Sequence, residues 1–62
     1  SELYQHVMGL PPKYRVILYL RYYEDFTTGE IARLLKIPQG TAAARLSRGR
    51  GLLGQQLRKG AA

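Results

Sequence analysis

The sequence has no cysteine, no tryptophan and only four acidic residues in 62 positions. The lack of cysteine excludes disulfide bonds and cysteine-based zinc sites. Four scattered carboxylates and one histidine are too few for a metal-binding cluster. A chain of 62 residues leaves room for one small domain and excludes the deep cleft that most enzymes use. We therefore expect a single domain over residues 1–62, with no catalytic site, no metal and no cofactor.

Long hydrophobic runs are also missing, although hydrophobic residues make up 45% of the chain. No run approaches the roughly 18 apolar residues of a membrane-spanning helix, and no signal-peptide pattern follows Ser1. We expect no membrane partner and a cytoplasmic location. Because the chain begins at Ser1 without Met, we also expect it to be a piece of a longer protein. The hydrophobic fraction is ordinary for a globular protein, so a packed core is expected.

Positive charge is present in excess and is unevenly placed. Ten Lys and Arg against four Asp and Glu give a net charge of +6. Residues 1–30 hold three basic and four acidic residues, a net charge of −1. Residues 31–62 hold seven basic and no acidic residues, a net charge of +7. Such asymmetry indicates a polyanionic partner, either nucleic acid or an anionic membrane.

Glycine, proline and apolar spacing predict an all-α fold, a small bundle of about four helices. Gly9 ends the first helix, and Leu10 is extended because it precedes Pro11. Pro12 suits the first turn of the next helix. These breaks argue against a cationic membrane-surface peptide, which would form one amphipathic helix. The expected helices cover residues 2–8, about 12–23, about 27–35, and 39 to at least 50.

Apolar residues at helical spacing predict which side chains form the core. Glycines in the last helix weaken it, since each costs about 1 kcal/mol relative to Ala. We expect that helix to bend or fray after Arg50 unless packing holds it. The predicted core residues are Leu3, Val7, Met8, Val16, Ile17, Leu20, Ile31, Leu34, Leu35, Ala42, Leu46, Leu53 and Leu57.

The third predicted helix has the clearest start signal. Thr27 and Glu30 fit a capping box, in which each side chain bonds the backbone N–H of the other residue. Only residues 36–38 separate this helix from the next, which is basic. Two short helices joined by such a turn predict a helix-turn-helix over about residues 27–50, with a recognition helix over about residues 39–57.

The side of the last helix opposite its apolar stripe is the candidate DNA surface, since successive residues turn by about 100°. Arg48 can donate two hydrogen bonds to guanine, Ser47 can donate or accept, and alanine can contact a thymine methyl group. Helix N-termini and flanking arginines suit phosphate. The predicted base-reading residues are Ala43, Ala44, Ser47 and Arg48. The predicted DNA-backbone contacts are Gln39, Gly40, Thr41, Arg45 and Arg50.

Several short motifs occur in a characteristic order from residue 10 to residue 57. They are Leu10-Pro11, Arg15, Leu20, Thr27, Glu30-Ile31-Ala32, Leu35, Pro38, Gly40-Thr41, Arg45-Leu46-Ser47-Arg48-Gly49-Arg50 and Leu53. Each motif alone is weak, but the ordered set resembles region 4 of bacterial RNA polymerase sigma factors of the sigma-70 type, most of all the extracytoplasmic-function group. Four positions depart from the pattern: Ala43, where Lys or Arg is common; Ala42, where Val is common; Lys36, where glycine often makes the turn; and Gly51, where a charged residue is usual. A left-handed Lys36 would cost roughly 1–2 kcal/mol.

The resemblance implies the DNA-binding domain of a transcription initiation factor. Such a domain recognises the −35 element of double-stranded promoter DNA with its last helix and docks on the β flap of core RNA polymerase. An anti-sigma factor is a further partner that the resemblance suggests. Mapped by motif position, the base-reading and backbone positions of the family fall on the residues of the last helix given above.

Two alternatives stay open. One is the helix-turn-helix domain of another transcription regulator. The other is a module that only docks on polymerase or on an anti-sigma factor, for which the stripe of Leu3, Tyr4, Val7 and Met8 is the candidate surface. We expect the five tyrosines to pack in the core or an interface, away from the basic helix, and not to stack on bases. His6 is expected at the surface.

Overall fold

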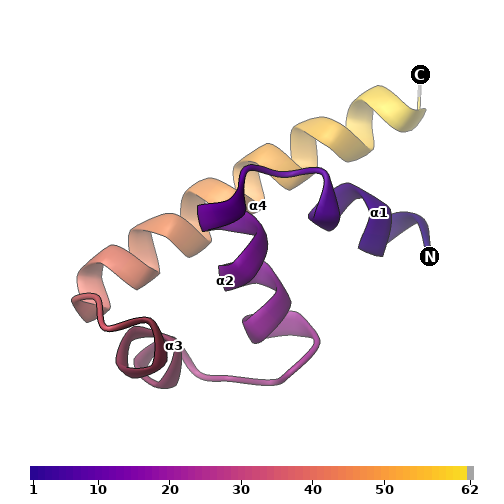
Figure 1. Cartoon of the computed structure of the whole chain (residues 1–62). Coiled ribbons are helices and arrows are strands. Elements are labelled where there is room, and N and C mark those ends of the chain that lie inside the picture. Colours follow the sequence, from indigo (N-terminus) through magenta and orange to yellow (C-terminus); the bar gives the residue numbers. More distant parts are fainter. Residues whose placement is uncertain (62) are drawn as a thin grey trace.

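The structure is a computed structural model that describes residues 1–61, with side chains through residue 60. Within these residues the chain forms four α-helices and no strand. Figure 1 shows α4 as a long rod that the other three helices approach from one side, α3 near its first turns and α1 near its end. The all-α prediction is therefore confirmed. The helices are α1 (Glu2–Met8), α2 (Pro12–Tyr22), α3 (Thr28–Leu35) and α4 (Gln39–Ala61).

Local signals start each of the first three helices. The Ser1 hydroxyl accepts a hydrogen bond from the Tyr4 backbone N–H at 3.2 Å, and Pro12 opens α2. The predicted capping box of α3 is present. The Thr27 backbone N–H donates to Glu30 Oε1 at 2.8 Å, and the Glu30 backbone N–H donates to Thr27 Oγ1 at 3.1 Å. These bonds satisfy two N–H groups that the helix start would otherwise leave without a partner.

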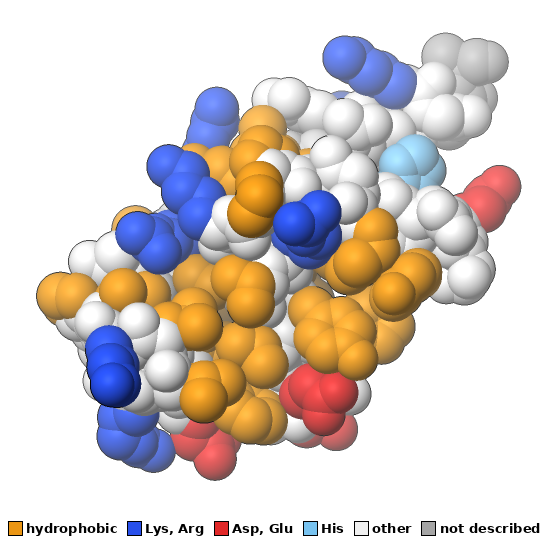
Figure 2. Space-filling model, viewed as in Figure 1, with side chains coloured by type: hydrophobic (Ala, Val, Ile, Leu, Met, Phe, Trp, Pro, Cys, Tyr) orange, Lys and Arg blue, Asp and Glu red, His pale blue; other side chains and the backbone are white. Residues whose placement is uncertain are grey.

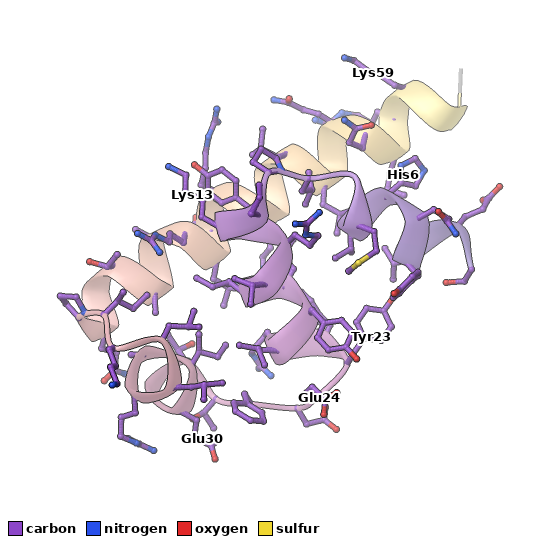
Figure 3. The ribbon with its side chains drawn as sticks, viewed as in Figure 1. His6, Lys13, Tyr23, Glu24, Glu30 and Lys59 are labelled. Atoms are coloured by element: carbon purple, nitrogen blue, oxygen red, sulfur yellow. The ribbon has the colours of Figure 1, made fainter. Side chains whose placement is uncertain are left out.

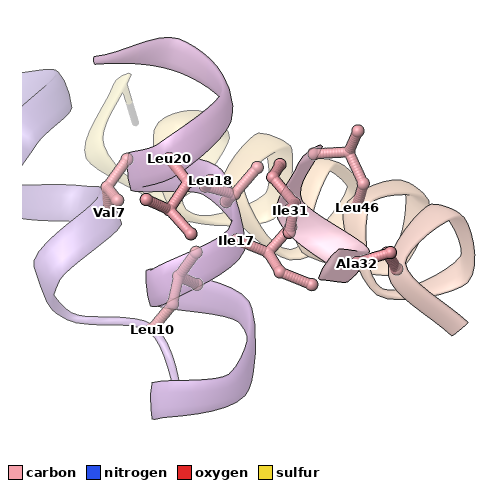
Figure 4. Packing of buried hydrophobic residues seen from close by; sticks show 9 residues of the cluster. Val7, Leu10, Ile17, Leu18, Leu20, Ile31, Ala32 and Leu46 are labelled. Carbon is pink, nitrogen blue, oxygen red and sulfur yellow. The ribbon is translucent and has the colours of Figure 1, made fainter. Parts of the chain in front are cut away.

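The core lies where α2 and α3 pack on α4, and α1 closes one end of it (Figure 4). Met8, Leu35 and Leu53, which were predicted for the core, pack against it and are partly buried. The buried apolar side chains are Val7, Leu10, Ile17, Leu18, Leu20, Ile31, Ala32, Ala42 and Leu46.

Part of the predicted core is wrong. Leu18, which was not predicted, is completely buried next to Ile17. Helix α2 touches α1, α3 and α4 together, so two successive residues face different neighbours and both become buried. A single apolar stripe describes a helix with one partner, which is why it failed here. The predicted core residues that are exposed are Leu3 at 45%, Val16 at 39%, Leu34 at 56% and Leu57 at 42%.

Helix α4 continues without a break to Ala61, so the bend or fraying expected after Arg50 does not occur. Packing against α2 supports the helix at one of its glycines, Gly49. Gly49 is buried under α2, and a Cβ atom added there would lie 3.3 Å from Leu18 Cδ1 and 3.5 Å from Tyr14 Cβ. The absence of a side chain at position 49 therefore lets α2 and α4 approach closely.

The turn between α3 and α4 depends on a left-handed residue. Lys36 has left-handed backbone, with φ 58° and ψ 47°, as was considered from the sequence. Its N–H bonds to carbonyl oxygens at the end of α3. The following N–H, of Ile37, donates to the Ala32 carbonyl oxygen at 3.0 Å. Left-handed backbone is unfavourable for any residue with a Cβ atom, so this turn stores strain that glycine would not carry.

Matched glycine substitutions test the close approach of α2 and α4. At Gly51 an added Cβ meets nothing within 4 Å, so Gly51→Ala should raise the free energy of unfolding by about 0.5–1 kcal/mol. At Gly49 the same change gains helix propensity but presses on Leu18. Gly49→Ala should therefore stabilise clearly less than Gly51→Ala, or destabilise, in urea unfolding followed by circular dichroism. Equal gains at both sites would contradict the packing role of Gly49.

A second substitution tests the strain in the turn. Lys36→Gly should raise the free energy of unfolding by about 1 kcal/mol relative to Lys36→Ala, because only glycine adopts left-handed backbone without steric cost. Both variants remove the same positive charge, so electrostatics cancels in the comparison. Thermal unfolding at one ionic strength provides the measurement. If the alanine variant is as stable as the glycine variant, the left-handed turn carries no strain.

Candidate nucleic-acid interface

The predicted base-reading residues lie on the exposed side of α4, opposite the core. Ala42, Leu46 and Gly49 are buried and define the inner side of the helix. The exposed residues are Ala43, Ala44, Ser47 and Arg48. Because the buried and exposed sets alternate at helical spacing, the four side chains share one surface that is open to a partner.

The predicted backbone contacts surround this exposed side. Gln39 and Gly40 are exposed at the first turn of α4, which carries no acidic residue, and Thr41 is half-buried beside them. Arg45 is half-buried on one flank of the helix, and Arg50 is exposed on the other. The first turn combines uncommitted backbone N–H groups with the positive end of the helix dipole, an arrangement that attracts phosphate.

Two polar side chains stand beside the start of α4: Gln39, a predicted backbone contact, and Arg33, which was not predicted. Arg33 of α3 has its Nη1 atom 3.6 Å, and Gln39 its Oε1 atom 3.8 Å, from the position that a Cβ atom on Gly29 would take. Both polar groups therefore gather around the same glycine at the junction of α3 and α4. Their separation in sequence hides this proximity, which depends on the turn at Lys36.

Arg50 makes a contact that the sequence did not predict. Its Nε–H donates to the Tyr22 hydroxyl oxygen at 2.6 Å, and its Cζ atom lies 5.8 Å from the centre of the Tyr22 ring. The expectation that all tyrosines lie away from the basic helix is wrong for Tyr22, and also for Tyr14, which packs against Gly49 of α4. Tyr22 and Arg50 are 28 positions apart, so no local pattern could reveal the pair.

The other tyrosines largely follow the expectation of packing contacts. Tyr19 stacks on Tyr23 with ring centres 5.4 Å apart, and Tyr4 meets Tyr23 edge-on at 5.9 Å. A hydrogen bond with Glu24, together with the negative charge of that carboxylate, raises the pKa of the Tyr19 hydroxyl. Figure 3 shows Tyr23 and Glu24 at the end of α2, and the contact of Tyr23 with Tyr4 joins this end to α1.

A shallow apolar groove lies between α1 and α2. Figure 2 shows hydrophobic side chains gathered over these two helices, interrupted by basic groups. The Arg15 Nη1 group donates to the Met8 carbonyl oxygen at 3.3 Å across the groove. The predicted stripe on α1 divides here, because Val7 enters the core while Leu3 and Tyr4 stay exposed. The groove has a volume of about 570 Å³ and is lined by Tyr4, Met8, Pro12, Arg15, Val16 and Tyr19.

Helix α1 packs against the far part of α4. His6 is half-buried, where the sequence suggested a surface residue, because its ring lies against the last turns of α4 (Figure 3). A Cβ atom added to Gly60 would be 3.5 Å from His6 Nε2. None of the helices in the described part of the chain is long and apolar enough to cross a membrane. Residues 1–61 also place no group of three or more His, Cys, Asp or Glu where it could hold a metal ion.

Comparison with known proteins adds the decisive observation to this geometry. The family described as Sigma-70, region 4 matches residues 1–53. The chain belongs to the sigma-70 region 4 family. The match takes in all of α1, α2 and α3 and the exposed residues of α4 described above. The resemblance seen in the ordered motifs is thereby confirmed.

A relative from Bacillus subtilis (strain 168) extends the assignment of this region 4 chain. The "ECF RNA polymerase sigma factor SigW" is 41% identical to it over 58 residues. The matched segment is 94% of this chain and 31% of that relative, so the chain spans less than a third of the relative's length. The similarity agrees with the extracytoplasmic-function group to which the sequence motifs pointed.

The capping box of this region 4 chain generates a pH prediction. The Thr27 backbone N–H, the Thr27 hydroxyl and nearby Arg33 hold the pKa of Glu30 below its ordinary value of 4.5. A lowered pKa adds stability above the pKa of the unfolded state, and that stability is lost as pH falls through the pKa of the folded state. The difference in melting temperature between the natural chain and Glu30→Gln should therefore shrink when pH falls from neutral through the pKa of Glu30 in the folded chain. A difference that stays constant down to acidic pH would show that Glu30 does not act through its charge.

Proposed function

We propose that the chain is the DNA-binding domain of a sigma factor of the extracytoplasmic-function group and that α4 recognises the −35 promoter element. The observation that carries this proposal is the exposed side of α4, where Ser47 and Arg48 follow Ala43 and Ala44 by one turn on the second helix of a helix-turn-helix. An α-helix fits the major groove of DNA, and a side without bulky residues lets the helix enter deeply. The setting of this function is the cytoplasm.

Within this proposal the residues have separate roles. Arg48 has the donors to pair with guanine O6 and N7, and Ser47 can bond either a donor or an acceptor. Ala43 and Ala44 offer methyl groups to thymine. Sequence readout therefore rests mainly on one arginine. The other proposed contacts bind phosphate without regard to sequence, and they are Gln39, Gly40, Thr41, Arg45 and Arg50.

Docking on the β flap of core RNA polymerase is the second part of the proposal. The groove between α1 and α2 supports it, because apolar and aromatic side chains line a hollow there and stay exposed to solvent. Tyr4 and Val16 are both 39% exposed at this groove. An anti-sigma factor with an apolar helix would fit the same surface. The groove is also the feature that favours the alternative of a docking module that does not read DNA.

Selection of binding sites from a pool of random duplexes tests the reading of DNA by α4. The natural chain should enrich one short sequence. Arg48→Ala should lose preference at one base pair of that sequence, a cost of about 1–3 kcal/mol against the correct site. Arg45→Ala is the matched control, since removal of a phosphate contact should weaken binding to all duplexes alike. It should also lower the number of counterions released on binding, read from the salt dependence of the affinity, by about one.

Several outcomes would contradict this assignment of roles. If Arg48→Ala weakens all duplexes equally, Arg48 binds phosphate and does not read sequence. If no sequence is enriched and DNA perturbs NMR signals only between Leu3 and Tyr23, the docking module is the better description. Arg45 and Arg48 lie outside the core, so both variants should stay folded. Circular dichroism of each variant checks this.

A further inference from the structure

Tyr22 and Arg50 form the one side chain–side chain hydrogen bond between helices in the described part of the chain. The bond joins the last residue of α2 to the middle of α4 at 2.6 Å. Both residues are exposed, and Tyr22 has 48% of its surface open to solvent. A bond that remains accessible to water adds little to the stability of the fold. Its position at the edge of the candidate DNA surface points to a different use.

We propose that Tyr22 is a positioning residue that holds the guanidinium group of Arg50 ready for a DNA phosphate. The inference rests on the proposed function, in which Arg50 is a backbone contact. It adds a residue from α2 to an interface that the sequence placed on α4 alone. It also gives the pair a defined ligand chemistry, the phosphodiester oxygens of a duplex that lies along α4.

The geometry of Arg50 supports this role. Arg50 follows Ser47 by three residues, so it lies about 60° around the helix from Ser47 and about 4.5 Å further along its axis. That places it on the flank of the exposed side, where a groove-bound helix meets the sugar–phosphate backbone. The α2 end of the molecule borders this flank, because Tyr22 reaches Arg50 there.

The chemistry of the hydrogen bond leaves the phosphate-binding groups free. A guanidinium group has five N–H donors, and Tyr22 uses only the Nε–H. The donors on the two terminal nitrogens remain for phosphate oxygens, which arginine binds as a planar fork. The Tyr22 hydroxyl accepts this bond through its oxygen, so its role is to hold Arg50 and not to bind phosphate itself.

Order before binding is the physical gain. A free arginine side chain samples many rotamers and loses that freedom when it grips a phosphate. The bond to Tyr22 and the contact between ring and guanidinium, 5.8 Å from ring centre to Cζ, restrict Arg50 in the unbound chain. Without this restriction of Arg50, binding to DNA should weaken about 3- to 10-fold, the range expected for the ordering of one long side chain.

A double-mutant cycle on the whole chain tests the proposal. The probe is a fluorescently labelled duplex of mixed sequence, because phosphate contacts do not depend on base identity. Tyr22→Phe should weaken binding by the stated factor in the natural chain and should have no effect in an Arg50→Ala background. Tyr23→Phe is the matched control. It removes the hydroxyl of the neighbouring residue, whose ring faces Tyr19 and Tyr4, and it should leave the affinity unchanged.

A spectroscopic signal separates positioning from a general effect on the fold. The NMR resonance of the Arg50 Nε–H should be sharp in the unbound natural chain and should shift and exchange faster with water in Tyr22→Phe. The melting temperatures of the natural chain, Tyr22→Phe and Tyr23→Phe should agree closely. An unchanged Nε–H resonance in Tyr22→Phe would show that the bond does not form in solution and would overturn the proposal.

The binding outcomes keep this inference distinct from the proposed function. If Arg50→Ala does not weaken binding, the role of Arg50 as a phosphate contact fails, and the positioning role fails with it. If Arg50→Ala weakens binding but Tyr22→Phe does not, the positioning role alone is overturned. If the two effects add, Tyr22 acts on DNA independently of Arg50, and the positioning role is again wrong.

Discussion

The missing side chain at Gly49 controls how this small domain is assembled. Leu18, which is fully buried, occupies the space over that α-carbon, and the contact lets α2 lie close against the middle of α4. The other helices then take positions that follow from this one, because α3 is tied to α4 by a short turn and α1 is tied to α2. The close approach also brings the end of α2 to Arg50. A bulkier residue at position 49 would press on Leu18 and Tyr14 of α2.

Sequence reasoning succeeded where the determining forces act between near neighbours. The capping box of Thr27 and Glu30 was predicted because its partners are three residues apart, and the breaks at Gly9 and Pro38 follow from backbone chemistry alone. The exposure of Ala43, Ala44, Ser47 and Arg48 was predictable as well, since it follows from helical spacing once Ala42 and Leu46 are taken as the inner side. The roles of these exposed residues stay predictions.

The failures share a physical cause, which is that the position of a distant partner decides the outcome. Leu34 has the spacing of a core residue and is the most exposed large apolar side chain described, because its side of α3 has no helix to cover it. The glycines of α4 suggested a weak helix, yet the helix is unbroken and α2 packs on it at Gly49. The pair of Tyr22 and Arg50 joins two helices whose relative placement no local pattern contains. Tertiary geometry thus decided each case that sequence left ambiguous.

The unbroken length of α4 has a mechanical consequence. Its 23 residues span about 34 Å, most of the 37 Å long dimension of the molecule. The helix carries the exposed DNA-facing residues near its start and rests against His6 near its end. Such a rod acts as a lever: a tilt of about 10° at the start would displace the far end by about 6 Å. A small change in the angle at which the first turns of α4 bind a partner would thus produce a larger displacement at the opposite end of the domain.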